Sequence, residues 1–264
     1  NKLPKIVIPV HFAGQSCDMQ SIHKLSKEFG FKIIEDASHA IGGKYLNKPI
    51  GGCQYSDITV FSFHPVKIIT TAEGGLATTN QQDLAEKMQL FRAHGITRDS
   101  KLMTKETEGG WYYQQVELGF NYRMNDLQAA LGIAQMKRLD KFITIRHLLK
   151  QRYHELLKDL PLITPTQSSD SYSSLHLYPV QLKLEQISKT QNQIFDELRK
   201  SGVGVNLHYI PIHMQPYYQN TGFKKGDFPK VEDYYSRAIS IPIYQGLTFE
   251  YQDKVVKVLK ELLI

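Results

Sequence analysis

Short apolar runs, separated by one helix-like stretch, mark the first 80 residues. They predict buried strands over residues 5–10, 31–35 and 58–63, and a further strand over residues 76–79 after a glycine pair. A strand, a helix and a second strand in this order predict parallel strands joined by a right-handed crossover. This part of the chain therefore predicts an α/β fold with a mostly parallel sheet flanked by helices.

Other stretches carry apolar residues at helical spacing. Asp18 and Gly30 are the expected caps of a first helix, and a second is predicted over residues 82–94. Further helices are expected over residues 190–200 and from Thr248 to the end of the chain. These helices supply the layers that would cover the sheet.

A single long helix is predicted from Asn125 to just before Pro161, because apolar residues recur there at roughly helical spacing. We expect it to join two domains. Residues 1–140 would form the larger domain, and residues 141–264 would contain the linking helix and a smaller α+β domain. In the smaller domain, strands are predicted over residues 175–182 and 203–210.

Composition narrows the class of protein. With 264 residues, 41% hydrophobic and 22% charged, the chain is typical of a globular protein. The net charge of +6 is spread along the chain, so no nucleic-acid-binding surface is expected. No apolar run approaches the roughly 18 residues of a membrane span, and no signal peptide is evident. Cys17 and Cys53 lack metal-ligand spacing, which favours reduced thiols and a cytoplasmic location.

Candidate chemistry lies where two predicted strands end. Asp36 follows the second strand and Lys67 follows the third, and carboxyl ends of parallel strands share one edge of a sheet. Taken singly, Lys67 would be interpreted as a solvent-exposed surface residue and Asp36 as a turn residue. His39 and Ser62 would be interpreted as ordinary polar residues. Together they match pyridoxal phosphate (PLP) chemistry, which needs an amine to form an imine and a carboxylate to hold the ring nitrogen protonated.

Six segments, in order along nearly the whole chain, also carry a resemblance to a known family. They are similar to the DegT/DnrJ/EryC1/StrS family of sugar aminotransferases, which has PLP fold type I, the aspartate-aminotransferase-like fold. The matching segments are residues 8–14, 35–40, 62–75, 118–130, 204–213 and 241–244.

Within that family, Ser62-Phe63-His64-Pro65-Val66-Lys67 resembles the branch that acts in pseudaminic acid biosynthesis. Residues 94–98 and 111–113 resemble it as well. That branch aminates C4 of a UDP-linked 4-keto-6-deoxy-N-acetylhexosamine, with glutamate as amino donor. The resemblance therefore implies a PLP-dependent nucleotide-sugar aminotransferase.

The resemblance also implies a role for individual residues. Lys67 would bind the cofactor covalently and move a proton between sugar C4 and cofactor C4′. Asp36 would pair with the pyridinium nitrogen, and His39 would lie near the phenolic oxygen. Ser62 would donate a hydrogen bond to the cofactor phosphate.

Other implied roles involve a second subunit and the substrate. Asn121 would reach the phosphate of the neighbouring subunit, with Arg123 nearby as a substrate-binding residue, which makes a homodimer with shared active sites. His208 and Tyr209 would contact the nucleotide-sugar. No metal site is expected, because His208 and His213 have no evident acidic or thiol partner.

The sequence departs from the family pattern at its start. Family members begin with an earlier glycine- and threonine-containing segment that cradles the cofactor phosphate, and an aromatic residue there stacks on the ring. Both are missing, so we expect the chain to be part of a longer protein. A truncated non-catalytic remnant or regulatory binding protein is therefore an alternative. A PLP-dependent sugar dehydratase is a weaker one, because such enzymes replace the lysine with histidine and Lys67 is present.

Overall fold

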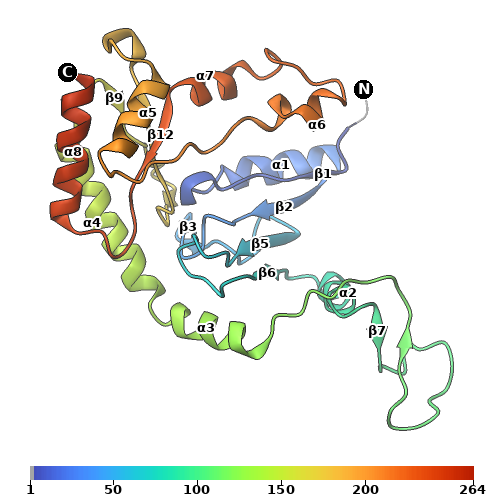
Figure 1. Cartoon of the computed structure of the whole chain (residues 1–264). Coiled ribbons are helices and arrows are strands. Elements are labelled where there is room, and N and C mark those ends of the chain that lie inside the picture. The colour runs from blue at the N-terminus through green and yellow to red at the C-terminus, as the bar shows by residue number, and fades with distance from the viewer. Residues whose placement is uncertain (1–2) are drawn as a thin grey trace.

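The computed structural model describes residues 3–264 and has a central sheet of four strands. The order is β1-β2-β5-β6, in which β1, β2 and β5 run parallel and β6 is antiparallel to β5. Helix α1 crosses one face of this sheet (Figure 1). The mostly parallel α/β arrangement predicted from the sequence is confirmed. The bounds are β1 Ile6–Val7, α1 Met19–Phe29, β2 Lys32–Asp36, β5 Ile58–Ser62 and β6 Gly75–Thr78.

Smaller elements surround this sheet. A segment containing α2, β7 and β8 extends away from it at one end (Figure 1). Their bounds are α2 Gln82–Arg92, β7 Ile96–Thr97 and β8 Gln114–Gln115; those of a small three-stranded sheet are β3 Lys44–Tyr45, β4 Lys48–Pro49 and β10 Ser171–Tyr172. Short 3-10 turns lie at Phe12–Gly14, Leu184–Gln186 and Ile212–Met214, and two further helices are α6 Pro216–Gln219 and α7 Pro229–Arg237.

The prediction of a buried strand over residues 5–10 is wrong in two respects. Only Ile6–Val7 is a strand, and Ile6, Ile8 and Val10 are 50%, 57% and 48% exposed. Within the described residues β1 pairs only with β2, so it is the edge of the sheet and its apolar residues are incompletely covered. Apolar composition alone cannot distinguish a central strand from an edge strand.

The single long helix predicted from Asn125 is in fact two helices, α3 (Asp126–Met136) and α4 (Leu139–Leu157). Asn125 caps α3 as expected, with its side chain accepting a hydrogen bond from the Gln128 backbone. The break falls at Lys137-Arg138, where the Arg138 N–H bonds to the Gln135 carbonyl at a spacing of three residues. Neither residue is a glycine or a proline, so the sequence gives no signal of the break.

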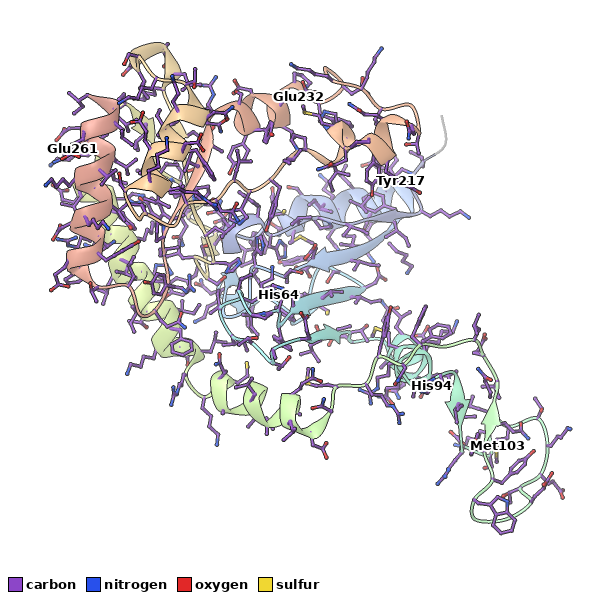
Figure 2. All side chains as sticks on the ribbon, viewed as in Figure 1. His64, His94, Met103, Tyr217, Glu232 and Glu261 are labelled. Carbon is purple, nitrogen blue, oxygen red and sulfur yellow. The ribbon has the colours of Figure 1, made fainter. Side chains whose placement is uncertain are left out.

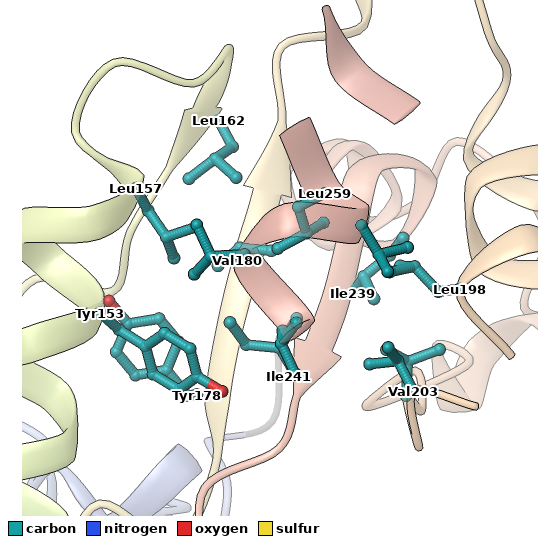
Figure 3. Close-up of a cluster of buried hydrophobic side chains, with 14 of the residues drawn as sticks. Tyr153, Leu157, Leu162, Tyr178, Val180, Leu198, Val203, Ile239, Ile241 and Leu259 are labelled. Carbon is teal, nitrogen blue, oxygen red and sulfur yellow. The ribbon is translucent and has the colours of Figure 1, made fainter. Parts of the chain in front are cut away.

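The C-terminal part contains a second sheet, of order β12-β11-β9, with antiparallel neighbours. Helices α4, α5 and α8 surround a large apolar cluster on it, which includes Tyr153, Leu157, Tyr178, Val180 and Ile239 (Figure 3). Thr190 and Thr248 cap the first turns of α5 and α8, and their side chains accept hydrogen bonds from the backbone N–H groups of Gln193 and Tyr251. The bounds are β9 Leu162–Ile163, β11 Tyr178–Leu182, α5 Gln191–Lys200, β12 Ala238–Ile241 and α8 Phe249–Leu263.

The strand predicted over residues 203–210 does not form. Val203 and Val205 are buried, which explains the alternating pattern, but only Asn206 pairs with the sheet, through two backbone hydrogen bonds to Ser240. The rest of the segment leaves the sheet and carries His208 and Tyr209 toward the N-terminal half of the chain. This departure is what brings both residues to the candidate site.

Helix α4 belongs to both halves of the core. Its first turns place Leu139 and Ile143 in an apolar cluster with Phe61 and Ile68, which lies beneath the end of β5. Its later turns place residues such as Tyr153 in the cluster of the C-terminal sheet. One helix therefore fixes the spacing between the two sheets.

A buried ion pair lies near the carboxyl end of β2. The Nε2 atom of His11, a residue with no exposed surface, lies 2.7 Å from Oε2 of Glu35, whose other oxygen accepts hydrogen bonds from Ser56 and Thr59. Burial alone would lower the pKa of His11, but hydrogen bonds with Cys17 and Glu35, and the charge of Glu35, raise it to about 9. Nδ1 of His11 lies 3.2 Å from the Cys17 backbone nitrogen, which donates to it when the ring is neutral.

This ion pair predicts a loss of stability at alkaline pH. Because the pKa of His11 is higher in the folded state than the 6.5 of the unfolded chain, its stabilising effect is complete below pH 6.5 and disappears as the pH rises through about 9. We expect the free energy of unfolding in urea to fall by on the order of 2 kcal/mol over that range. In His11→Gln the same titration should be flatter; equal slopes in the two proteins would contradict the assignment.

Candidate active site

Asp36 lies at the end of β2, with its backbone held on both sides. Its carbonyl accepts a hydrogen bond from the His11 N–H at 3.0 Å, and its own N–H donates to the Pro9 carbonyl at 2.9 Å. One carboxylate oxygen, Oδ1, accepts a hydrogen bond from the Ser38 N–H at 3.0 Å. The other oxygen has no hydrogen bond from a described residue and remains available to a ligand.

Lys67 lies in a turn that follows β5. Its neighbours Ile68 and Ile69 are only 2% and 1% exposed, so they anchor the turn in the core while the lysine itself is half-buried. Burial lowers the pKa of Lys67, although the negative charge of Asp36 acts in the opposite direction. The two residues predicted as a pair are therefore close enough for their charges to interact.

His39 lies beside this pair and is 7% exposed. Its Nε2 atom is 3.2 Å from the Tyr209 hydroxyl, and its ring lies 4.5 Å, centroid to centroid, from that of His176. Burial, together with the charges of Lys67 and His208, lowers the pKa of His39 to about 4. The ring is consequently neutral at physiological pH, with one nitrogen able to donate and the other to accept.

Ser62 ends β5, and its hydroxyl oxygen accepts a hydrogen bond from the His64 N–H at 3.4 Å. Its own O–H proton goes to no acceptor among residues 3–264. This hydroxyl can therefore donate to an anionic group, as the sequence predicted for a phosphate.

His208 and Tyr209 also reach this region. The Nδ1 atom of His208 lies 2.8 Å from the Ser240 hydroxyl, and both residues line a cavity of about 560 Å³. Burial, followed by the charge of Lys67, lowers the pKa of His208. The C-terminal half of the chain thus contributes directly to the site around Lys67.

Asn121 and Arg123 are not brought to the same place. Asn121 is exposed and pairs with Ala93. Ala93 adjoins His94, which lies on the segment that extends away from the central sheet. His64, next to the Lys67 turn, lies beside that sheet instead (Figure 2). No hydrogen bond among residues 3–264 connects Asn121 or Arg123 to the Lys67 group. Their predicted roles involve the neighbouring subunit, so this placement does not test them.

Sequence reasoning missed two buried residues of the site, His176 and Arg146. His176 lies before β11 without a motif around it, and Arg146 is a polar residue within the helical pattern of α4.

The expectation that His213 lacks an acidic partner is also wrong, because its Nε2 atom lies 2.8 Å from Oε1 of Glu232. Within residues 3–264, however, no group of three metal-ligating side chains exists.

The pattern of one protein family matches residues 1–260. The chain belongs to the DegT/DnrJ/EryC1/StrS aminotransferase family. The resemblance drawn from its sequence segments is thereby confirmed. None of the helices in residues 3–264 combines the length and apolarity needed to cross a membrane.

Individual relatives agree with this assignment. The Helicobacter pylori UDP-4-amino-4,6-dideoxy-N-acetyl-beta-L-altrosamine transaminase is 36% identical over 251 residues, which cover 95% of this chain and 64% of the relative. The structure of Helicobacter pylori PseC, an aminotransferase involved in the biosynthesis of pseudoaminic acid, matches with a TM-score of 0.87 and 32% identity, over 97% of this chain and 66% of that one.

A third relative is the PLP form of Spr1654 from Streptococcus pneumoniae, with a TM-score of 0.86 and 28% identity over 98% of this chain and 69% of that one. The predicted fold class is confirmed by these structures. The chain spans 61–67% of the length of the curated relatives it matches.

The free polar atoms of the site fit pyridoxal phosphate, the cofactor predicted from the sequence and present in the PLP form of Spr1654. Nδ1 of His39 is buried without a partner among residues 3–264, a cost that a ligand oxygen would remove. Lys67 can hold the aldehyde, and the free oxygen of Asp36 can hold the ring nitrogen. The hydroxyl of Ser62 can donate to the phosphate.

The burial of His39 predicts that it stays neutral across the physiological range. In an NMR titration between pH 5 and 8, the ring signal of His39 should keep the position of a neutral imidazole, because its pKa is about 4. The signal is assigned by its disappearance in His39→Asn. A signal that moves with a midpoint near 6.5, the value of a free histidine, would contradict the buried environment.

Proposed function

We propose that the protein is a PLP-dependent aminotransferase that moves an amino group from glutamate to C4 of a UDP-linked 4-keto-6-deoxy-N-acetylhexosamine. The observation that supports it most is the group formed by Lys67, Asp36 and His39 at the carboxyl end of the sheet. The name of the Helicobacter pylori relative, a UDP-4-amino-4,6-dideoxy-N-acetyl-beta-L-altrosamine transaminase, supports the choice of substrate. The pathway would be the synthesis of a surface sugar such as pseudaminic acid.

Each residue has a distinct task in this proposal. The bound cofactor supplies an electron sink that stabilises negative charge on the reacting carbon. Nζ of Lys67 would hold the cofactor aldehyde and, once free, would carry the proton that leaves or joins the reacting carbon. Its lowered pKa makes the neutral amine, the form that takes up a proton, more accessible. Asp36 would keep the ring nitrogen protonated, and His39, whose Nε2 atom is held by the Tyr209 hydroxyl, would donate to the phenolic oxygen.

We also propose that residues 1–140 and 141–264 act as two domains, with His208 and Tyr209 of the second contacting the nucleotide-sugar. The separate apolar clusters beneath the two sheets support this division. The active site would form at the carboxyl end of the first sheet, against the residues that follow Asn206 and leave the second sheet.

The role of Lys67 can be tested directly. Reduction of the cofactor-bound protein with borohydride should label the peptide that contains Lys67, and glutamate with a UDP-4-keto-sugar should give the 4-amino sugar by mass spectrometry. Lys67→Ala should lose both, with a drop in rate of at least about a thousandfold, because it removes the covalent anchor and the proton carrier together. Lys200→Ala, on the exposed side of α5, is the matched control. Labelling that persists in Lys67→Ala would refute the proposal.

We further propose a homodimer in which Asn121 binds the cofactor phosphate of the neighbouring subunit. The position of Asn121 on the extended segment, away from the Lys67 of its own chain, supports this arrangement (Figure 2). Leu118 and Tyr122 on the same segment are 87% and 75% exposed, which is unusual for apolar and aromatic side chains that no partner covers.

Complementation between two inactive variants tests the shared site. Lys67→Ala and Asn121→Ala should each have little activity, but an equal mixture that is unfolded and refolded together should recover about a quarter of the wild-type rate. Half of the dimers would then be mixed, and each mixed dimer would have one intact site. Recovery that never exceeds the mean of the two separate variants would mean that Asn121 serves its own subunit or none.

A further inference from the structure

The neutral ring of His39 has one proton and two nitrogens that can carry it. Burial lowers the pKa of His39 to about 4, so the ring has a single N–H group at neutral pH. The ring itself is held firmly, because it is 7% exposed and packs against His176 with 4.5 Å between the ring centroids. The backbone is held as well, since the Ser174 hydroxyl donates to the His39 carbonyl at 2.7 Å. The place of the ring is therefore fixed, and only the place of its proton is open.

The Nδ1 side of the His39 ring favours neither tautomer. The Nδ1 atom is buried and has no hydrogen-bond partner among residues 3–264. The neighbouring His176 ring does not supply one, because its own Nδ1 atom is buried and equally without a partner in the described chain. The tautomer of His39 must therefore be decided at its other nitrogen.

The Nε2 atom of His39 has one partner, the Tyr209 hydroxyl, at 3.2 Å. That hydroxyl has no other hydrogen bond with residues 3–264. Burial, followed by the negative charge of Asp36, raises the pKa of Tyr209, so the hydroxyl keeps its proton at neutral pH. A phenol shares its oxygen lone pair with its ring and is a better donor than acceptor, whereas the bare nitrogen of an imidazole accepts strongly. The favoured arrangement is thus the Tyr209 O–H donating to Nε2.

We infer that Tyr209 is a positioning residue that fixes His39 in the tautomer with the proton on Nδ1. Which nitrogen of a histidine carries the proton is set by the hydrogen bond that the other nitrogen makes. With Nε2 occupied as an acceptor, the buried Nδ1 atom always presents an N–H group, the form that can donate to an anionic oxygen. In the other tautomer Nδ1 would present a lone pair, which repels such an oxygen. Under the proposed function, on which this last step rests, that oxygen is the phenolic oxygen of the cofactor.

The same hydrogen bond joins the two halves of the chain. His39 follows β2 of the first sheet, whereas Tyr209 belongs to the residues that follow Asn206 and leave the second sheet. Tyr209 also lines the cavity of about 560 Å³, and its ring lies edge-on to that of Phe12 with 6.5 Å between the centroids. The tautomer of His39 therefore depends on the C-terminal segment being packed in place against the N-terminal half.

Nitrogen NMR of protein with isotope-labelled histidine tests the tautomer without cofactor or turnover. In the cofactor-free wild-type protein, Nδ1 of His39 should give the signal of a protonated nitrogen and Nε2 that of a bare one. Tyr209→Phe keeps the aromatic ring and removes the donor, so the proton should move largely to Nε2, the nitrogen that a neutral histidine in water prefers. Tyr234→Phe is the matched control. Tyr234 also packs on Phe12, at 5.9 Å, but its hydroxyl makes no hydrogen bond with a described residue.

Three NMR results would overturn the inference. The first is a wild-type His39 with its proton on Nε2, and the second is a proton that stays on Nδ1 in Tyr209→Phe. The third is a His39 ring that titrates in Tyr209→Phe with a midpoint of about 6.5, because Tyr209 would then only keep the ring buried. These measurements use cofactor-free protein, so they decide the tautomer even if borohydride leaves Lys67 unlabelled and the proposed function fails.

The half-reaction with glutamate separates this role from the contact with the nucleotide-sugar proposed for Tyr209. At saturating glutamate, single-turnover conversion of the bound cofactor, followed by absorbance, should be about fivefold to tenfold slower in Tyr209→Phe, because a hydrogen bond to the cofactor oxygen is weakened. Tyr234→Phe should keep the wild-type rate. A loss confined to the half-reaction with the nucleotide-sugar would assign Tyr209 to the sugar alone, and the inference would be wrong.

Discussion

The backbone of residue 36 is the constraint on which the site depends. Three hydrogen bonds fix this point of the chain: Asp36 N–H to Pro9, His11 N–H to Asp36, and Ala37 N–H to Val60. They come from the segment that follows β1 on one side and from β5 on the other, so the backbone that carries the carboxylate can shift only if both neighbours move away from it. Because a charge-pairing group must be held to within a fraction of an ångström, a strand end between two parallel neighbours suits it better than a free loop does.

Burial then separates the ionisable groups of the site into two kinds. His39 and His176 lose their charge because they lie in an apolar surrounding near cations, whereas Arg146 keeps its charge under the same burial because its intrinsic pKa is so high. The result is a pocket with neutral donors and acceptors beside one permanent cation. Such a division lets one small space hold an aromatic ring and orient an anion next to it.

The sequence predicted those parts of the site that follow from local pattern. Asp36 and Lys67 could be placed together because each follows a predicted strand, and strand direction decides which ends meet. The contact between His39 and Tyr209 joins residues 170 positions apart, so it depends on how the C-terminal segment returns, which periodicity does not encode. His176 and Arg146 were missed for the same reason: the burial of His176 and the backbone carbonyls that surround Arg146 exist only in three dimensions.

Helix α4 gives the architecture a further property. Its first turns pack beneath the strand that leads to Lys67, and its later turns pack against the sheet whose neighbouring segment carries His208. Adding one residue between Ile143 and Leu149 would turn the later contacts by about 100° relative to the earlier ones. The guanidinium of Arg146 lies within that interval, so a register shift there would disorganise the pocket while leaving Asp36, His39 and Lys67 chemically intact.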